Sequence, residues 1–173
     1  CLNNCPFCIN KAEYENPEGF SADKICESIR RMDAITPYCD FVFTGGEPFA
    51  ELNVLQQMLD EIPKTHKVYI NTTLPVSKFQ TEDDIVRFTE KNKDKITCIN
   101  VSRHMQHYVV ESNDGLLKRL AVPFRINCVL YKDYPNQDMI PYLERFRLIP
   151  GASIQFRFDY TETTPENLYE TEH

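Results

Sequence analysis

Residues 40–73 read DFVFTGGEPFAELNVLQQMLDEIPKTHKVYINTT, and this stretch decides the fold. It opens with a short run of β-forming residues, 40–44, which the glycines and proline of 45–48 bring to an end. Residues 52–62 follow, with leucine and isoleucine recurring at helical spacing. Residues 67–73 then form a second β-rich run. A strand, a helix and a strand with short links predict a βαβ unit with parallel strands.

The same alternation continues on both sides of this unit. Before it, Ser21 suits the N-cap of a helix over 21–32. After it, the pattern predicts helices at 82–92, 114–120 and 137–147, and strands at 96–103, 123–131 and 153–160. The five expected strands make a parallel sheet with right-handed crossovers. No repeat or linker divides the chain, so residues 1–173 are expected to form one α/β domain.

Polar side chains recur at every second position of the later strands. They are Asn71 and Thr73, Asn100 and Ser102, Arg125 and Asn127, and Gln155, Arg157 and Asp159. Parallel strands buried on both faces would be nearly all apolar. We therefore expect one face of the sheet to pack on helices and the other to bind a polar ligand. The alternative is an antiparallel sheet with one face in water.

The composition is that of a globular chain with an acidic surface. Of 173 residues, 42% are hydrophobic and 26% are charged, so the chain is long and apolar enough to form a core. Its formal net charge of −7 argues against nucleic acid as a partner. No apolar run approaches the ~20 residues that span a bilayer, and no secretory signal is visible. These features predict a cytoplasmic protein without a membrane partner.

Seven cysteines are present, and three of them form a tight motif. Cys1, Cys5 and Cys8 have the spacing C-x3-C-x2-C, which lets three thiolates converge on one soft metal centre. Structural zinc normally takes four ligands from two separated pairs, and no second pair exists here. A [4Fe–4S] cluster held by three cysteines leaves one iron open. The other cysteines are expected to pack apolar surfaces, with Cys26 inside its helix and Cys98 and Cys128 behind the sheet.

A second motif, Gly45-Gly46-Glu47-Pro48, comes at the carboxyl end of the first expected strand. Ligands of α/β folds bind at that end of the sheet. Two glycines let the backbone adopt a positive φ or approach a ligand closely. The exposed carbonyls and the Glu47 carboxylate would suit an ammonium group. An ordinary Gly-Gly turn is the alternative reading of this tetrapeptide.

Together the two motifs resemble the radical S-adenosylmethionine superfamily. The matching residues are Cys1, Cys5 and Cys8, the aromatic Phe7 before the last cysteine, and Gly45-Gly46-Glu47-Pro48 after the next strand. The resemblance implies a partial (β/α)6 barrel of parallel strands that extends over nearly the whole chain. It further implies that the first barrel strand lies upstream of Cys1, so that residues 1–173 are a core domain incomplete at both ends.

The resemblance also implies an oxidoreductase chemistry. The catalytic, metal-binding residues Cys1, Cys5 and Cys8 would hold a [4Fe–4S] cluster whose open iron binds S-adenosylmethionine. Reductive cleavage of that cofactor would release a 5′-deoxyadenosyl radical, which abstracts hydrogen from a small-molecule or peptide substrate, or from a partner enzyme. The electron would come from a reductase or from a donor of the flavodoxin or ferredoxin type.

The resemblance assigns the cofactor-binding residues one by one. In the loop Gly45-Gly46-Glu47-Pro48, the glycines and Glu47 would bind the methionine amino group, and Phe7 would border the adenine. Ser102 and Asn127 are the best matches to the polar strand residues that contact ribose or carboxylate in the family. Asn71 and Arg103 are weaker matches.

Several features of the sequence also have a simpler, structural interpretation. A zinc-binding or non-catalytic structural α/β domain remains the alternative to an enzyme. His104 and His107 are three residues apart and would suit either a metal or an ordinary loop beside a cleft. Arg157 and Asp159 form either a structural pair or part of a substrate cavity. The acidic run at 82–84 suits the positive amino end of a helix dipole.

Overall fold

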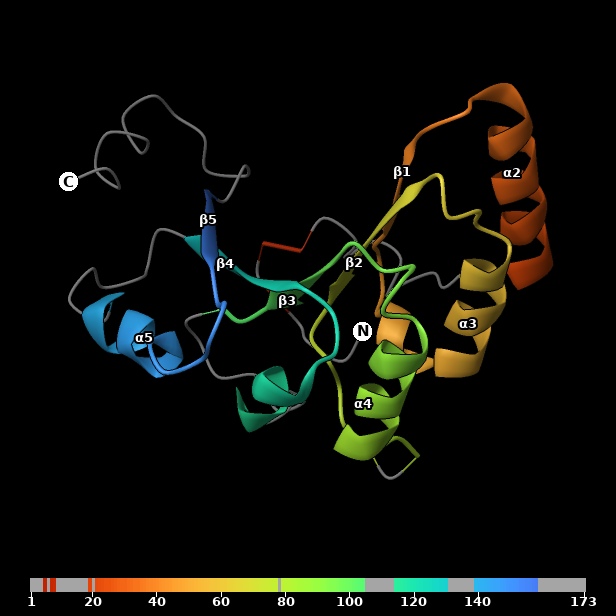
Figure 1. Ribbon diagram of the computed structural model, residues 1–173. Helices are drawn as coiled ribbons and strands as arrows, with labels where there is room; N and C mark the ends of the chain where they lie inside the picture. The colour runs from red at the N-terminus through yellow and green to blue at the C-terminus, as the bar shows by residue number, and fades with distance from the viewer. Residues whose placement is uncertain are drawn as a thin grey trace.

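Figure 1 shows the fold of the chain as a computed structural model, which describes Cys5, Phe7, Cys8, Gly19 and residues 21–77, 79–104, 114–130 and 139–158. Five strands are present in this part of the chain: β1 (Asp40–Phe43), β2 (Lys67–Thr72), β3 (Cys98–Ser102), β4 (Phe124–Leu130) and β5 (Ile154–Phe158). The helices between them are α2 (Ala22–Ile35), α3 (Leu52–Asp60), α4 (Glu82–Lys91) and α5 (Met139–Phe146), with 3₁₀ turns η1 (Pro48–Ala50) and η2 (Asp114–Arg119).

The strands form a single parallel sheet in the order β1-β2-β3-β4-β5, which is also their order along the chain. Sheet order and sequence order coincide because each crossover moves the chain by one strand in the same direction. The sheet is open, because β1 and β5 lie at opposite edges. The predicted α/β class and parallel sheet are confirmed, and the antiparallel alternative is wrong.

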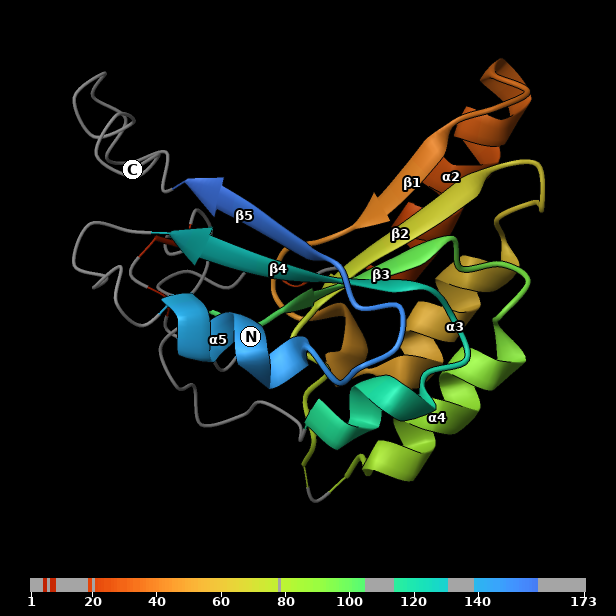
Figure 2. The same cartoon turned by 60° about the vertical axis from the view of Figure 1, so that its left-hand side comes forward.

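The helices gather on one face of the sheet. Figure 2 shows α3, α4, η2 and α5 below the strands, and α2 packs against α3. The strand residues that point toward these helices are apolar and almost fully buried: Val68, Ile70, Ile99, Val101, Ile126 and Cys128. Leu55, Leu59 and Ile85 meet them from α3 and α4. Burial of such a side chain contributes about 1.5–3 kcal/mol, so this layer stabilises the fold.

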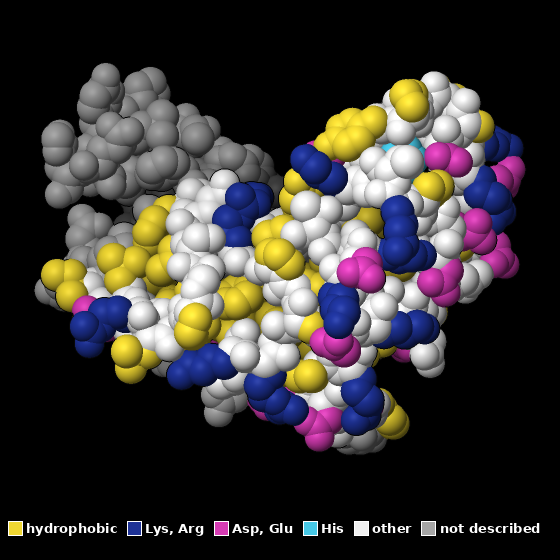
Figure 3. All heavy atoms as spheres, viewed as in Figure 1, with side chains coloured by type: hydrophobic (Ala, Val, Ile, Leu, Met, Phe, Trp, Pro, Cys, Tyr) yellow, Lys and Arg dark blue, Asp and Glu magenta, His cyan; other side chains and the backbone are white. Residues whose placement is uncertain are grey.

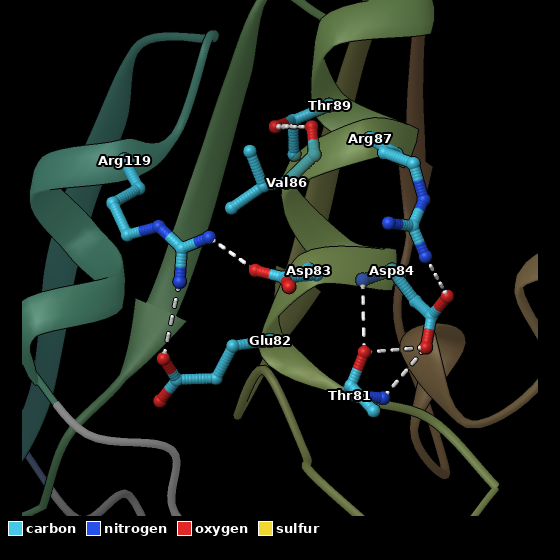
Figure 4. Close-up of polar contacts among 8 residues, drawn as sticks. All are labelled: Thr81, Glu82, Asp83, Asp84, Val86, Arg87, Thr89 and Arg119. Carbon is cyan, nitrogen blue, oxygen red and sulfur yellow. Dashed lines mark hydrogen bonds and ion pairs between the residues drawn. The ribbon is translucent and has the colours of Figure 1, made fainter.

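Helix α4 begins with a capping box, drawn in Figure 4. The Thr81 side chain accepts a hydrogen bond from the Asp84 backbone N–H at 3.2 Å, and the Asp84 carboxylate accepts from the Thr81 N–H at 2.8 Å. The Thr81 N–H and hydroxyl, which both donate to the carboxylate, and the Arg87 guanidinium lower the pKa of Asp84 to about 2. Glu82 and Asp83 pair instead with Arg119 of η2. The acidic run therefore caps its own helix and also binds the next element.

Charged side chains of both signs are mixed over the outer surface of the helices, as Figure 3 shows on the side of α2, α3 and α4. Ion pairs of this surface include Arg30 with Glu61 at 2.8 Å and Lys93 with Glu90 at 2.6 Å. Such exposed pairs contribute little stability each, but they keep the helical surface polar. Within the described ranges, no helix combines the length and apolar character needed to cross a bilayer.

The short helix expected at 114–120 is present as the 3₁₀ helix Asp114–Arg119. One expectation requires correction. Cys98 does not lie behind the sheet with Cys128, because it is two residues before Asn100 and so shares the polar face with it. The other two packing predictions are confirmed, since Cys26 and Cys128 are buried among apolar residues. Helices α3 and α4 end one or two residues inside their predicted limits, whereas α2 continues three residues beyond its own.

Candidate functional site

The second and third cysteines of the motif share one turn. The Cys8 backbone N–H donates to the Cys5 carbonyl at 3.1 Å, and Cys5 is buried. The Phe7 ring meets the His104 ring edge to face, with 4.7 Å between the ring centroids. Since His104 is the second residue after the end of β3, this contact brings the cysteine turn to the carboxyl edge of the sheet. Cys1 lies outside the described residues, among which no group of three His, Cys, Asp or Glu side chains could hold a metal.

The glycine loop after β1 has the conformation that its sequence requires. Gly45 and Gly46 have φ values of 75° and 42°, in the left-handed region that L side chains avoid. A Cβ on Gly46 would meet no atom within 4 Å, so the backbone angle, not crowding, selects glycine there. Pro48 then opens η1 at a position where no backbone donor is needed. Two successive left-handed residues turn the chain sharply at the carboxyl end of β1.

Glu47 ties this loop to the end of β2. Its Oε1 accepts from the Phe49 backbone N–H at 3.0 Å and from the Thr72 hydroxyl. Its Oε2 accepts from both the backbone N–H and the hydroxyl of Thr73, each at 2.8 Å. Four donors thus occupy the two carboxylate oxygens of Glu47. The predicted contact between Glu47 itself and a ligand stays a prediction.

Three polar side chains form a hydrogen-bonded row across the polar face of the sheet. Arg125 of β4 donates to the Asn100 side-chain oxygen from Nε at 3.1 Å and from Nη2 at 2.8 Å. The Asn100 side-chain nitrogen donates in turn to Asn71 Oδ1 at 2.8 Å. Their register positions are adjacent on β2, β3 and β4. The row includes Asn71, a predicted cofactor-binding residue, while Asn100 and Arg125 were expected on the polar face but not assigned to the cofactor.

Asn127 lies one step closer to the carboxyl edge on the same face. It stands beside Ser102 of β3 on one side and Gln155 of β5 on the other. Its side chain is only 7% exposed, and its Oδ1 accepts no hydrogen bond from any described residue. A buried polar atom without a partner is costly and rare in folded proteins. The predicted pair Ser102 and Asn127 is therefore brought together, with one acceptor left open.

Arg103 supports the site from within the fold. Its side chain is fully buried, and Nη1 donates to the carbonyls of Thr73 at 2.7 Å and Ser102 at 3.0 Å. Its Nε lies 3.3 Å from an Asp114 carboxylate oxygen, and the Tyr142 hydroxyl donates to its backbone carbonyl. Arg103 was a weaker candidate for cofactor contact. In the structure its guanidinium binds protein atoms, and its contact with a cofactor stays a prediction.

His104 is buried and serves as an acceptor. The Val129 backbone N–H donates to its Nδ1 at 3.2 Å, which requires a neutral ring nitrogen at that position. Burial, reinforced by the nearby Arg103 charge, lowers the pKa of His104 to about 4. His107 and Asp159 lie outside the described residues, and Arg157 is exposed with Nη2 3.4 Å from Gln155 Oε1.

The residues that sequence reasoning missed share a recognisable signal. Thr72 was not expected in the site, and Thr73, Asn100 and Arg125 were noted only as polar strand positions. Each is a polar residue in, or directly after, a strand whose alternate residues are apolar. Which of these side chains meet depends on the register between strands, and the sequence of one strand does not contain that information.

No protein-family model matches the chain, and no curated protein sequence matches it. The function must therefore be argued from the residues of the site.

Proposed function

We propose that the chain is the core domain of a radical S-adenosylmethionine enzyme. One observation carries the proposal: the Cys5–Cys8 turn lies against His104 at the carboxyl edge of the sheet, the edge at which the left-handed Gly45-Gly46 loop also ends. Ligand sites of parallel α/β folds are found at this edge. The Cys5–Cys8 turn and the glycine loop thus both lie at the edge where such a site is expected, which supports the proposal.

The finer fold proposed with this function is a partial (β/α)6 barrel. Five parallel strands in sequential order, with helices on one face, correspond to five successive units of such a barrel. A further strand would pair with the edge of β1 that no described strand occupies. In that arrangement the polar face of the sheet is the inner wall of the barrel.

The chemistry of the donor set fits the two cofactors. Cys1, Cys5 and Cys8 would hold the [4Fe–4S] cluster, since three thiolates leave one iron open. The loop carbonyls around Gly45 and Gly46 would accept from the amino group of S-adenosylmethionine. Asn127 Oδ1, buried without a partner among the described residues, is an acceptor suited to a ribose hydroxyl. When bound, the pair of cofactors would supply a 5′-deoxyadenosyl radical that abstracts hydrogen from the substrate.

The chain's own residues would orient the cofactors and exclude water. Glu47 fixes the loop through Thr72 and Thr73, so the loop carbonyls keep one direction. Arg103 holds the ends of β2 and β3 together by donating to the Thr73 and Ser102 carbonyls. Phe7 covers the buried His104 ring and would border the adenine. The substrate would be a small molecule or a peptide, and a flavodoxin- or ferredoxin-type protein would supply the electron.

Anaerobic reconstitution with iron and sulfide tests this proposal. We expect about four iron and four sulfide per chain. The electron paramagnetic resonance signal of the reduced protein should change when S-adenosylmethionine is added. Cys5→Ala should lose the cluster. Cys39→Ala should keep it, because Cys39 precedes β1 at the amino edge of the sheet and contacts His66.

Two outcomes would contradict the proposal. A folded protein that assembles no cluster, or a Cys5→Ala variant that behaves like the parent, would remove the radical chemistry. About one zinc per chain and no bound iron would instead support the structural, zinc-binding alternative. A circular dichroism spectrum of each sample establishes that the protein compared is folded.

A further inference from the structure

A cysteine, a histidine and an aspartate meet at the amino edge of the sheet, where α2 leads into β1 (Figure 1). Cys39 directly precedes β1, His66 directly precedes β2, and Asp33 lies in the last turn of α2. The Lys67 backbone N–H donates to the Cys39 carbonyl at 3.1 Å, which joins the two strands where they begin. The fold thus gathers three chemically active side chains at the edge opposite the glycine loop.

The imidazole of His66 links the other two side chains. Cys39 Sγ lies 3.5 Å from Nδ1, and Asp33 Oδ1 lies 2.9 Å from Nε2. The Cys39 backbone N–H also donates to Nδ1, at 3.0 Å, so Nδ1 carries a lone pair and the ring proton is on Nε2. Nε2 therefore donates to the carboxylate, and Nδ1 accepts from the thiol. A nucleophile, a base and an orienting carboxylate in this order activate hydroxyl and thiol groups in enzymes.

The burial of the three groups suits a reactive thiol. The His66 side chain is fully buried, and the Phe41 ring packs edge to face on it with 5.3 Å between the ring centroids. The imidazole is therefore held in one orientation. Cys39 is only half-buried, unlike Cys26 and Cys128, which lie within the apolar core. A small molecule in solution can thus reach the Cys39 thiol, while the base behind it is shielded from water.

Asp33 supplies the charge that stabilises a protonated His66. The other charged groups at this end of the sheet are engaged with Tyr38: the Lys67 ammonium lies 5.8 Å from its ring centroid, and Asp40 accepts from its hydroxyl at 3.1 Å. When Nδ1 takes a proton, it gives up the bond from the Cys39 backbone N–H. The bond from the imidazolium to Asp33 becomes charge-assisted at the same time, and its greater strength offsets that loss.

We propose that Cys39, His66 and Asp33 form a reactive-thiol site, at which Cys39 exchanges with a small disulfide such as glutathione disulfide and becomes a mixed disulfide. The Cys39 sulfur attacks one sulfur of the disulfide while His66 Nδ1 takes the thiol proton. A new S–S bond forms, the old S–S bond breaks, and the departing thiolate receives the proton from His66. Cys39 is oxidised and the released sulfur is reduced, so one thiol and one disulfide stand on each side. The site does not depend on the proposed function, because its residues lie at the other edge of the sheet.

The chain contains its own reference thiol. Cys98 is also partly exposed, but its thiol donates to the Ile99 carbonyl at 3.7 Å, and burial raises its pKa. Trypsin separates the two thiols, because Cys39 is the single cysteine of residues 32–64 and Cys98 that of residues 96–103. Mass spectrometry of the digest therefore gives a rate of modification for each cysteine in the same sample.

The probe is glutathione disulfide, added anaerobically to the folded chain and quenched with acid at successive times. At pH near 7 we expect Cys39 to form its mixed disulfide about tenfold faster than Cys98, or more. The Cys39 rate should also fall less steeply than the Cys98 rate from about pH 8.5 to about pH 7, because His66 takes the proton where few ordinary thiols are ionised.

Two variants test the partners of Cys39. Asp33→Asn keeps an oxygen that accepts from His66 Nε2 but removes the charge, so the Cys39 rate should fall severalfold and follow pH as steeply as the Cys98 rate. Asp23→Asn is the matched control at an exposed aspartate in the first turn of the same helix, and its rate should stay within about twofold of the parent. In His66→Asn the amide oxygen accepts from the Cys39 N–H but takes no proton, so the rate should fall about tenfold.

Three results would overturn the inference. They are equal rates at Cys39 and Cys98 in the parent, a folded Asp33→Asn protein that reacts like Asp23→Asn at every pH, and a folded His66→Asn protein that reacts like the parent. Circular dichroism establishes that each variant is folded. Should His66→Asn not fold, Asp33→Asn decides, because its exposed side chain changes without loss of a buried group.

Discussion

The Glu47 carboxylate accepts four hydrogen bonds, and this number decides its role. A carboxylate has about four lone-pair positions, so the Phe49, Thr72 and Thr73 donors fill them. The negative charge is thereby spread over donors from η1 and from the end of β2. At this position glutamate acts as a fixed part of the loop.

Glu47→Gln should destabilise the fold. The amide replaces one acceptor oxygen with a donor, so at least one N–H or hydroxyl of Thr72 or Thr73 loses its partner. We expect a loss of about 1–3 kcal/mol in the free energy of unfolding, measured by urea denaturation. Glu51→Gln is the control, because the exposed Glu51 side chain caps no helix, and it should stay within about 0.5 kcal/mol of the parent. Equal stability of the two variants would contradict the prediction.

His104 makes the stability depend on pH. The unfolded chain protonates this histidine near its ordinary value of 6.5, whereas the folded protein does so only at about pH 4. The unfolded state therefore binds more protons between these values, and the stability contributed by His104 is lost as pH falls through that window. A shift of this size corresponds to about 3 kcal/mol.

His104→Asn isolates this contribution. The asparagine oxygen can accept from the Val129 N–H as the ring nitrogen does, but it does not titrate. We expect the stability difference between parent and variant to change in the variant's favour by about 3 kcal/mol from pH 6.5 to 4. Urea denaturation of both proteins across this range measures it, and a difference independent of pH would refute the shifted pKa.

The amino end of α4 is stabilised by two kinds of contact, one within the helix and one with a distant element. Thr81 and Asp84 cap the helix by bonds that the spacing T-x-x-D contains in itself. Glu82 and Asp83 then bind Arg119, which is more than thirty residues away in sequence. The first set of contacts forms in any helix of this sequence, and the second exists only once η2 packs beside α4.

Thr81→Ala should weaken α4 through its cap. Loss of the hydroxyl leaves the Asp84 backbone N–H without its acceptor, at a cost of about 1 kcal/mol in unfolding free energy. Thr65→Ala removes an exposed hydroxyl that bonds no described residue, so it should change the stability by less than about 0.5 kcal/mol. Urea denaturation of the pair gives the comparison, and the prediction fails if the two variants are equally stable.

A network of ion pairs near the candidate site connects β3, η2 and α5. Arg103 at the end of β3 pairs with Asp114 of η2, and Asp114 also binds Arg145 of α5 with Nη2 at 3.0 Å. The same guanidinium holds the Thr73 carbonyl after β2. The carboxyl ends of two strands, a 3₁₀ turn and a helix are therefore linked through one buried side chain.

Arg103→Met should destabilise the fold by about 3–5 kcal/mol, because two carbonyls lose their donor and Asp114 loses its buried partner. Arg87→Met removes an exposed arginine paired with Asp84 and should cost less than about 1 kcal/mol. Thermal and urea unfolding of both variants test this. A loss for Arg103→Met no larger than for Arg87→Met would show that the charge chain is not important for stability.

Local sequence determined the elements and their class. Apolar residues at helical spacing and short β-rich runs suffice to predict α2, α3, α4 and the five strands within a few residues, because these patterns express local burial. The alternation of strands and helices was enough to predict a parallel sheet, because parallel strands need crossover connections and a helix usually supplies them. The glycines at 45 and 46 likewise predicted their own turn through their conformational freedom.

Only the tertiary structure decided which polar residues act together. Glu47 meets Thr73, and Arg125 aligns Asn100 and Asn71, because register and crossover lengths bring separate strands to the same height. Arg103 was a candidate ligand in the sequence and is a buried support in the fold. A strand's own sequence specifies which side chains share a face, but the partners across that face come from other strands, and their placement depends on the packing of the whole core.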